Sequence, residues 1–404
     1  GTGTGTGPEI NLGFEPQFLI VKNATSANSW FVFDNMRGIV SGYNDFEFYA
    51  DTTSAEVSVD RLSLTPTGFK LKDGEAGGLN TGDTHVYIAI RRPDPLVAKP
   101  IEAGTEVFAI DNDTNAEPDW RSNFPVDFAF SKQTTGSNWW TSARLLQGIR
   151  GYIDTSDTFV VGNTWADFDW MNGWSTGNFN SSTYSWMFKR HAGFDVVTYE
   201  GNANNAGSIT DLTVKHNLGR VPEMMWIKNL DNSYEWYVYH KGLNGGTNPQ
   251  NYTIQLSTTN VQANDGVMTW QGKLPTSKAF TLGGHFVVNK ENSTSLAMLF
   301  ASVDGISKVG YYAGDGSTSH TITTGFTPRF LIIKVIDASN SWFLYDSLRG
   351  LGAGNDPYLQ MENTNAQGGA SDDVFSVSST GFTIIKNYAS VNASGSNYIY
   401  YAHA

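Results

Sequence analysis

The chain has 404 residues, no cysteine, a formal net charge of −13 and only 16% charged residues. Its length predicts two to four domains of roughly 100–200 residues each. The charge argues against binding to nucleic acid, which needs a clustered basic face, and the lack of cysteine excludes disulfides and thiolate metal sites. No apolar run approaches the ~18 residues needed to cross a membrane, and no signal peptide is visible.

Short apolar runs separated by Gly, Ser, Thr and Asn dominate the sequence, and no stretch has convincing helical periodicity. Runs of this kind, alternating or fully apolar, predict β-strands and an all-β fold of sandwich type. The opening segment GTGTGTG, with no initial Met, is expected to be an exposed or assembly-dependent arm of a processed chain or fragment.

The first recurring element along the chain is an apolar run that ends in lysine. It reads GFEPQFLIVK at 13–22, FPVDFAFSK at 124–132, LGRVPEMMWIK at 218–228 and GFTPRFLIIK at 325–334. Such runs are typical of central strands buried on both faces. In each copy a tryptophan follows the lysine eight residues later, in the pairs Lys22 and Trp30, Lys132 and Trp140, Lys228 and Trp236, and Lys334 and Trp342. The repetition predicts four copies of one module.

The second element is the phrase NSWFVFDNMRG at 28–38, which returns as NSWFLYDSLRG at 340–350. An Asp at the end of a strand can cap a turn, pair with the Arg three residues later and leave the following Gly to adopt a positive φ. We therefore interpret Asp34 with Arg37, and Asp346 with Arg349, as turn chemistry. The alternative is a ligand-binding loop, although the two middle copies keep the tryptophan and lose the acid.

Later elements close each module. LSLTPTGFKL matches FSVSSTGFTI, and an aromatic-rich strand ends every copy. The predicted modules are residues 1–97 with the N-terminal arm, 98–192 as a degenerate copy, 193–305 and 306–404. The segment RRPDPLVAKP at 91–100 is interpreted as a linker, because its prolines cannot donate hydrogen bonds to a β-ladder.

The order GFxPxFLIxK, SxSWFxxDxxRG, TGF and a closing aromatic strand resembles a repeated β-domain of bacteriophage virion proteins. This domain occurs in tail-fibre and appendage proteins, especially of phages that infect marine bacteria and cyanobacteria. The resemblance covers essentially the whole chain, and it is weakest in the second module. It implies four tandem jelly-roll or concanavalin A-like β-sandwiches with a structural or host-recognition role, and it carries no catalytic residues.

The segment NTWADFDWMNGW combines aromatic rings with acids and an amide, which is the chemistry that sugar rings need. The candidate glycan-binding residues are Trp165, Asp167, Asp169, Trp170, Asn172 and Trp174. The alternative is that these tryptophans fill a core or a subunit interface. A further alternative is that Asp167 and Asp169 form a catalytic carboxylate pair, because concanavalin-like folds also host glycan hydrolases. The segment DNDTN resembles the start of a calcium loop but lacks its distal Glu, so a turn is expected and no metal.

Together with these observations, the resemblance implies a non-enzymatic bacteriophage virion structural protein without cofactor, acting as a tail fibre, appendage or capsid decoration. Its expected partners are further copies of itself, for example in a trimer, other virion proteins and host-surface glycans bound in a lectin-like manner. Its expected location is the virion or the extracellular space. The alternatives are a glycan-degrading depolymerase and a cellular extracellular filament or surface protein.

Overall fold

The computed structural model describes residues 7–72, 79–80, 82–95, 97, 99–113, 116–161, 166–177, 180–204 and 211–404. Within these ranges all strands pair in antiparallel sheets, and α1 (Phe286–Asn289) is the only α-helix. The predicted all-β fold with sandwich-like groups of sheets is therefore confirmed. The described residues also include the short 3-10 helices η1 (Gly104–Glu106), η2 (Arg144–Leu146), η3 (Leu243–Gly246) and η4 (Pro249–Asn251). None of the helices described here has the length and apolar character required to cross a membrane.

The described strands form four successive groups, which we call units 1 to 4, and among these strands no sheet combines members of two units. Unit 4 has a larger sheet in the order β25-β32-β27-β28-β29 and a smaller sheet in the order β26-β31-β30. Its strands are β25 (Ser307–Ala313), β26 (His320–Thr323), β27 (Phe330–Val335), β28 (Phe343–Asp346), β29 (Tyr358–Gln360), β30 (Phe375–Ser378), β31 (Gly381–Ile384) and β32 (Asn397–His403).

Unit 3 repeats this plan with the larger sheet β17-β24-β19-β20-β21-β22 and the smaller pair β18-β23. Its strands are β17 (Phe194–Glu200), β18 (Leu212–Lys215), β19 (Met224–Asn229), β20 (Tyr237–His240), β21 (Tyr252–Gln255), β22 (Ala263–Asn264), β23 (Ala279–Leu282) and β24 (Thr294–Phe300).

Unit 2 has the larger sheet β14-β13-β12-β11-β16-β9 and the smaller pair β10-β15. Its strands are β9 (Phe108–Asn112), β10 (Trp120–Arg121), β11 (Phe128–Gln133), β12 (Trp140–Ala143), β13 (Ile149–Tyr152), β14 (Val160–Val161), β15 (Gly173–Trp174) and β16 (Thr183–Phe188).

Unit 1 has the larger sheet β5-β4-β3-β2-β8 and the smaller sheet β1-β7-β6. Its strands are β1 (Glu9–Asn11), β2 (Pro16–Asn23), β3 (Trp30–Asp34), β4 (Asp45–Tyr49), β5 (Val57–Val59), β6 (Leu62–Thr65), β7 (Gly68–Leu71) and β8 (His85–Arg91). Among the described strands, β8 is an edge strand, whereas its equivalents β16, β24 and β32 each pair with a further strand.

The side chains of each larger sheet alternate between two faces, as in any β-strand. In β27, Leu331 and Ile333 join the core that also contains Phe382 and Ile384 of the smaller sheet. The intervening residues of β27 point to the opposite side, which we call the outer face of the larger sheet. In a two-sheet sandwich this face would ordinarily meet solvent, yet in units 2 to 4 it is buried.

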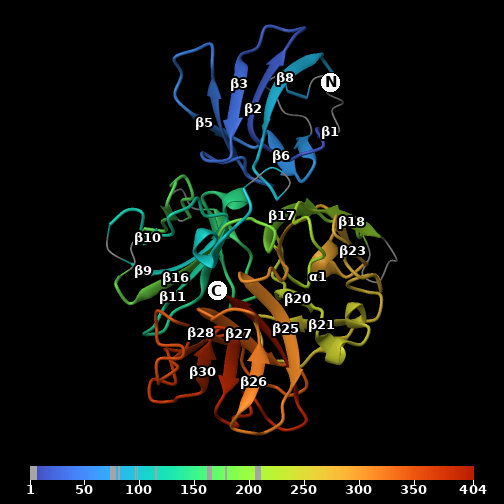
Figure 1. Cartoon of the computed structure of the whole chain (residues 1–404). Coiled ribbons are helices and arrows are strands. Elements are labelled where there is room, and N and C mark those ends of the chain that lie inside the picture. Colours follow the sequence, from blue (N-terminus) through green and yellow to red (C-terminus); the bar gives the residue numbers. More distant parts are fainter. Residues whose placement is uncertain are drawn as a thin grey trace.

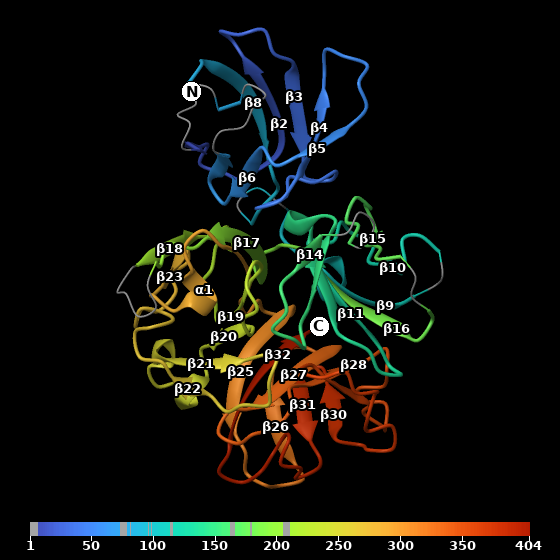
Figure 2. The same cartoon turned by 180° about the vertical axis from the view of Figure 1, so that it is seen from behind.

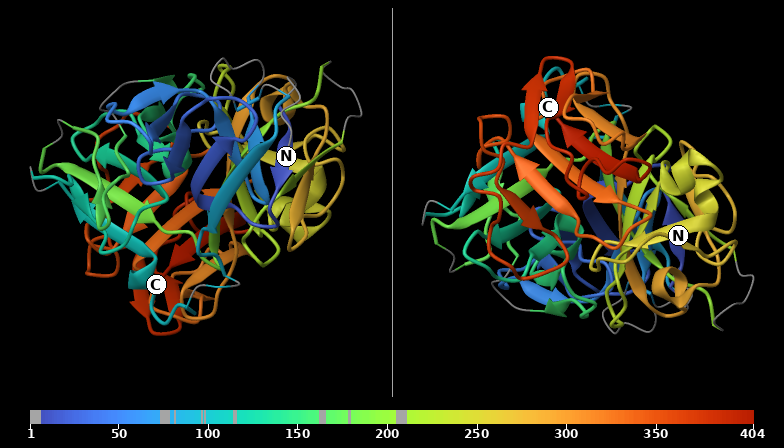
Figure 3. Two further views of the ribbon diagram at one scale, coloured as in Figure 1. Left: turned by 90° about the horizontal axis from the view of Figure 1, so that it is seen from above. Right: turned by 90° about the horizontal axis from the view of Figure 1, so that it is seen from below.

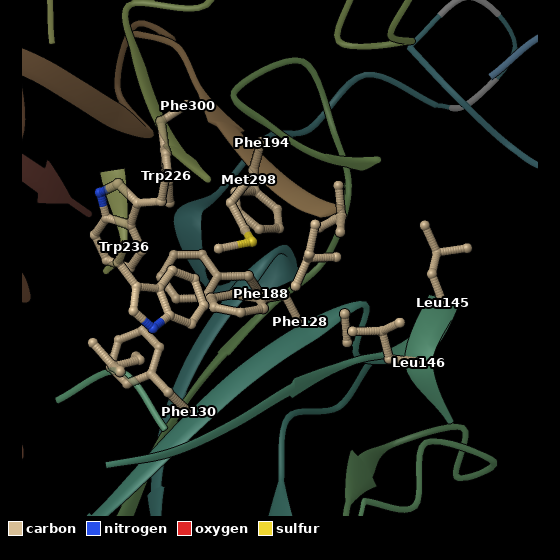
Figure 4. Close-up of a cluster of buried hydrophobic side chains, with 14 of the residues drawn as sticks. Phe128, Phe130, Leu145, Leu146, Phe188, Phe194, Trp226, Trp236, Met298 and Phe300 are labelled. Carbon is tan, nitrogen blue, oxygen red and sulfur yellow. The ribbon is translucent and has the colours of Figure 1, made fainter. Parts of the chain in front are cut away.

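The outer faces of units 2, 3 and 4 meet one another at the centre of the molecule. The three units lie around this centre, with unit 1 placed above units 2 and 3 (Figures 1 and 2). The ring of Phe188 in unit 2 lies 6.2 Å from Phe300 in unit 3 and 6.2 Å from Phe330 in unit 4, while Phe300 lies 5.0 Å from Tyr401 in unit 4. Figure 4 shows how the aromatic side chains of units 2 and 3 point toward each other. The three units therefore share one aromatic core.

Unit 1 overlies the junction between units 2 and 3 (Figure 3). A buried ion-pair network fixes it there, because both guanidinium NH2 groups of Arg190 donate to the Glu15 carboxylate at 2.7 Å, and Arg190 Nε lies 2.7 Å from Asp195 Oδ1. Burial opposes the charge of Arg190, but the carboxylates of Glu15 and Asp195 raise the pKa of this guanidinium above its ordinary value. The linker contributes Arg92, whose Nε lies 3.2 Å from Glu15.

Candidate functional site

The repeated lysines join neighbouring units. The lysine near the end of β11, β19 or β27 is fully buried and donates to two backbone carbonyls, one in its own unit and one in the next. The bonds between units run from Lys132 to Asn363 at 2.8 Å, from Lys228 to Ser156 at 2.8 Å and from Lys334 to Thr259 at 3.2 Å. Unit 2 thus donates to unit 4, unit 4 to unit 3, and unit 3 to unit 2. Burial lowers the pKa of each of these lysines to about 8.

The repeated tryptophans follow the same cyclic order. The indole N–H groups donate to the carbonyl that ends a strand in the neighbouring unit: Trp139 to Gln360 at 2.8 Å, Trp236 to Tyr152 at 2.8 Å and Trp342 to Gln255 at 2.9 Å. The six lysine and tryptophan contacts together form a closed ring of hydrogen bonds around the shared aromatic core.

One residue of the predicted pattern needs correction. The equal spacing selected Trp140, but Trp139 makes the contact between units. Trp140 is the neighbouring strand residue, paired with Ser131, and the Arg150 guanidinium lies 3.7 Å from the centre of its ring. The loop from Lys132 is one residue shorter than in the other copies, so a count of eight residues overshoots.

Unit 1 contains the equivalent lysine and tryptophan, but among the described residues these two side chains do not join unit 1 to a neighbouring unit. Lys22 is half-buried and donates to the Asn28 carbonyl in its own unit. Trp30 pairs in register with Lys22, and its side chain is exposed. Within the described part of the chain, neither side chain donates to a carbonyl of another unit.

The Asp–Arg–Gly turn occurs in both predicted places. Asp34 Oδ1 accepts from Arg37 N at 2.9 Å and its Oδ2 lies 2.7 Å from Arg37 Nε, while Gly38 has a φ of 126°. Asp346 and Arg349 repeat the geometry at 2.9 and 2.6 Å.

The surroundings of the two turns differ. Asp346 is buried and also accepts a hydrogen bond from the indole of Trp186 in unit 2 at 3.1 Å. Asp34 and Arg37 are partly exposed, and Arg37 pairs with Glu56 in its own unit.

The predicted glycan-binding segment is only partly available at the surface. Trp174 is fully buried, its ring centre lies 5.0 Å from that of Trp120 and 5.3 Å from that of Phe168, and its N–H donates to Ser185. Both of its faces therefore belong to the core of unit 2. Trp170 is half-buried and Asn172 is exposed. Trp165 lies outside the described residues.

The two candidate carboxylates lie next to each other. Asp167 Oδ1 accepts from Gln147 Nε2 at 3.0 Å and from the Asp169 backbone N–H at 3.2 Å. Partial burial, together with a hydrogen bond to the Asp167 carboxyl, raises the pKa of Asp169 to about 6. Carboxyl groups that bond to each other are closer than the roughly 5 Å that a retaining glycosidase needs across its scissile bond.

The predicted calcium-like turn lies partly outside the described residues, which omit 114 and 115. Asp111 Oδ2 accepts from Arg121 N at 2.7 Å, and Asp113 is buried. Over the described ranges, no group of three or more His, Cys, Asp or Glu residues is placed to hold a metal ion.

Two buried acids, Asp45 and Asp356, each hold a loop through backbone hydrogen bonds, and neither acid was identified from the sequence. Asp45 accepts from the backbone N–H groups of Val40, Arg61 and Leu62 at 2.8 to 2.9 Å. Asp356 accepts three backbone bonds in the same way at 2.7 Å. Each acid follows the glycine of the Asp–Arg–Gly turn by six or seven residues, a recurrence that could have revealed them.

A cavity of about 610 Å³ lies beside the linker, between units 2 and 3. Its lining combines acidic and basic side chains, among them Glu106, Lys189 and Arg220. None of the predicted site residues that the structure describes lines this cavity.

The fold and its junctions define a protein of repeated β-sandwiches in which the recurring residues hold the repeats together. The chain belongs to the family described as Domain of unknown function (DUF7483), whose model matches residues 1–93 and 131–404. The unmatched residues 94–130 comprise most of the linker, β9, β10 and the start of β11, and they lie mainly in the module that is most degenerate in sequence. A comparison with curated proteins finds no match.

Proposed function

We propose that this chain is a non-enzymatic structural protein of a bacteriophage virion, acting as a tail fibre, appendage or capsid decoration. The observation that carries the proposal is the use of the repeated Lys and Trp residues as junctions between units. Residues repeated for a reaction would be expected to line a cavity, whereas these residues are enclosed by neighbouring β-sandwiches. The resemblance of the motifs to virion β-domains supports the proposed location.

Self-association, contact with other virion proteins and binding of host-surface glycans belong to the same proposal. The exposed Asp169 and Asn172 and the half-buried Trp170 remain candidates for glycan contact. A glycan array with the purified chain, and with Trp170→Ala, tests this part. Binding that is lost in the variant supports it, and the absence of binding by the native chain counts against it.

The location is tested by mass spectrometry and immunogold labelling of purified particles. The proposal expects stoichiometric amounts of the chain in virions and labelling at a defined substructure. Finding the chain instead in filaments or on the surface of uninfected cells would favour the cellular alternative.

The raised pKa of Asp169 is the one observation that favours a glycan-degrading depolymerase, because a general acid needs a proton near neutral pH. The contact between the two carboxyls argues against it. Turnover of host polysaccharide should be absent, and Asp167→Asn and Asp169→Asn should therefore change nothing. Turnover that both variants abolish would establish the enzyme instead.

A further inference from the structure

The outer face of the larger sheet in unit 1 is largely apolar and open to solvent, with Lys22 on it and the Arg37 guanidinium 4.1 Å from the centre of the Phe48 ring. Lys22 pairs with Val86, Ile20 with Ile88 and Val32 with Phe48, so these side chains share one face of four adjacent strands. The exposed members of this surface, which we call the unit 1 face, are Trp30, Phe48, Val86, Ile88 and Ile90. Soluble monomers rarely leave large contiguous apolar patches uncovered unless the patch binds something.

The equivalent positions of unit 4 are buried. Ile88 is equivalent to Tyr401, because Ile88 pairs with Ile20 of β2 and Tyr401 pairs with Ile332 at the same position of β27. Ile88 is 60% exposed and Tyr401 is 1% exposed. Likewise Trp30 and Phe48 are each 40% exposed, while the equivalent Trp342 and Leu359 are 1% and 0% exposed. The difference is therefore one of surroundings and not of residue character.

An additional strand beside β8 would not remove this exposure. Such a strand would cover the edge of the sheet, next to Tyr87 and Ile88. Trp30 lies on β3 and Phe48 on β4, which are two and three strands further along, and neighbouring strands lie about 4.8 Å apart. The covering group must therefore lie on the face itself.

Units 2 to 4 show what covers this kind of face. Each outer face is buried by the outer faces of two other units, and polar contacts fix the arrangement at its rim. Unit 1 retains both the donors and the acceptor for that rim. The donors are Lys22 and Trp30. The acceptor is the Tyr49 carbonyl, because Tyr49 pairs with Phe31 in the same way as Gln360 pairs with Phe343 in unit 4. Tyr49 is therefore equivalent to Gln360, whose carbonyl accepts from Trp139.

We propose that the unit 1 face binds the same face of two further copies of this chain, forming a homotrimer with a threefold axis at unit 1. The three copies of unit 1 then repeat the packing of units 2, 3 and 4, with the Trp30 indole donating to the Tyr49 carbonyl of the next copy. In a closed threefold ring each copy donates to one neighbour and accepts from the other, so that every hydrogen bond at the rim can form. The inference deepens the self-association part of the proposed function and holds equally for a cellular assembly.

The test is the mass of the purified 404-residue chain in solution, measured by sedimentation equilibrium or light scattering over a range of concentrations. We expect a species of three times 44.2 kDa. Ile88→Lys places a charge on the face at strand β8, and Phe48→Lys places one on the same face at strand β4. Each should raise the concentration needed for trimer formation by at least about tenfold, as expected for the loss of a central interface residue.

The matched control is Val161→Lys, since Val161 is as exposed as Ile88 but lies on β14 of unit 2. This variant should leave the trimer unchanged, and circular dichroism should show all three variants folded. A chain that stays monomeric at every concentration, or an oligomer that resists both Ile88→Lys and Phe48→Lys, would overturn the proposal. A dimer would overturn the threefold arrangement. None of these results bears on whether the chain is found in virions, so the two proposals can fail separately.

Discussion

Units 1 and 4 are the most similar in sequence and the least similar in surroundings. Both contain the phrase NSWF followed by an Asp–Arg–Gly turn, and both build a five-stranded sheet with a three-stranded partner. In unit 4 the phrase lies in the shared core, where Trp342 and Asp346 contact units 3 and 2. In unit 1 the equivalent Trp30 is exposed and the equivalent Asp34 is partly exposed. Identical residues can therefore contribute very different amounts to stability, depending on whether a neighbouring unit is present.

The largest effect is expected for the two equivalent tryptophans. Trp342→Ala should destabilise the chain by about 3–5 kcal/mol, because it leaves a large cavity and removes the donor to Gln255. Trp30→Ala in the monomeric state should cost about 0.5 kcal/mol or less, as for other exposed positions. Denaturant unfolding monitored by hydrogen exchange of β28 and β3 measures both. Equal losses would show that the surroundings do not decide the contribution.

The attachment of unit 1 should depend on Arg190. Arg190→Met leaves the carboxylates of Glu15 and Asp195 buried without their main partner, which typically costs about 3–5 kcal/mol. Lys70→Met is the matched control, because the Lys70–Glu200 pair also joins units 1 and 3 but is exposed, and it should cost less than about 1 kcal/mol. Small-angle scattering should show unit 1 released in the first variant only. Retention of the compact form in Arg190→Met would mean that apolar contacts alone hold unit 1.

A smaller difference is expected between the two turns. Asp346→Asn weakens the buried pair with Arg349 and should cost about 2–3 kcal/mol. Asp34→Asn affects a partly exposed pair and should cost less than about 1 kcal/mol. Thermal unfolding of the two variants compares them directly. A greater loss in Asp34→Asn would contradict the contrast between the units.

The junction between units 3 and 4 should also weaken in acid. His240 accepts from Gly242 N at 2.9 Å and its other nitrogen lies 3.3 Å from the Tyr400 carbonyl oxygen, so the buried ring is neutral. Burial lowers its pKa to about 3, whereas the unfolded value is about 6.5. The unfolded chain therefore binds the proton first, and stability should fall by about 1.4 kcal/mol per pH unit between these values.

In His240→Gln this contribution to the slope should disappear. Stability curves of both proteins between pH 4 and 7 provide the measurement. An unchanged slope would assign the acid sensitivity to other groups, such as His403, whose pKa burial also lowers to about 3.

The sequence was sufficient for the all-β class and for the repetition, because strand periodicity and spacing are local properties. It could not reveal the ring, since nothing near Lys132 indicates that its acceptor is Asn363, more than two hundred residues away. The difference between Trp139 and Trp140 depended on a loop shorter by one residue. The core alternative proved right for Trp174, but the sequence could not show that its indole stacks on Trp120, which is distant in sequence. Periodicity thus predicted the elements, while the candidate site depended on contacts between distant segments.

The hydrogen-bond ring has a direction, because each β-sandwich offers ammonium and indole donors on one flank and carbonyl acceptors on the other. A polypeptide truncated to two of these sandwiches would expose complementary ends, donors at one and acceptors at the other. Such ends can be satisfied only by recruiting a third body or by linking molecules head to tail into open chains. In the packing seen here, three sandwiches complete one circuit and leave no end free.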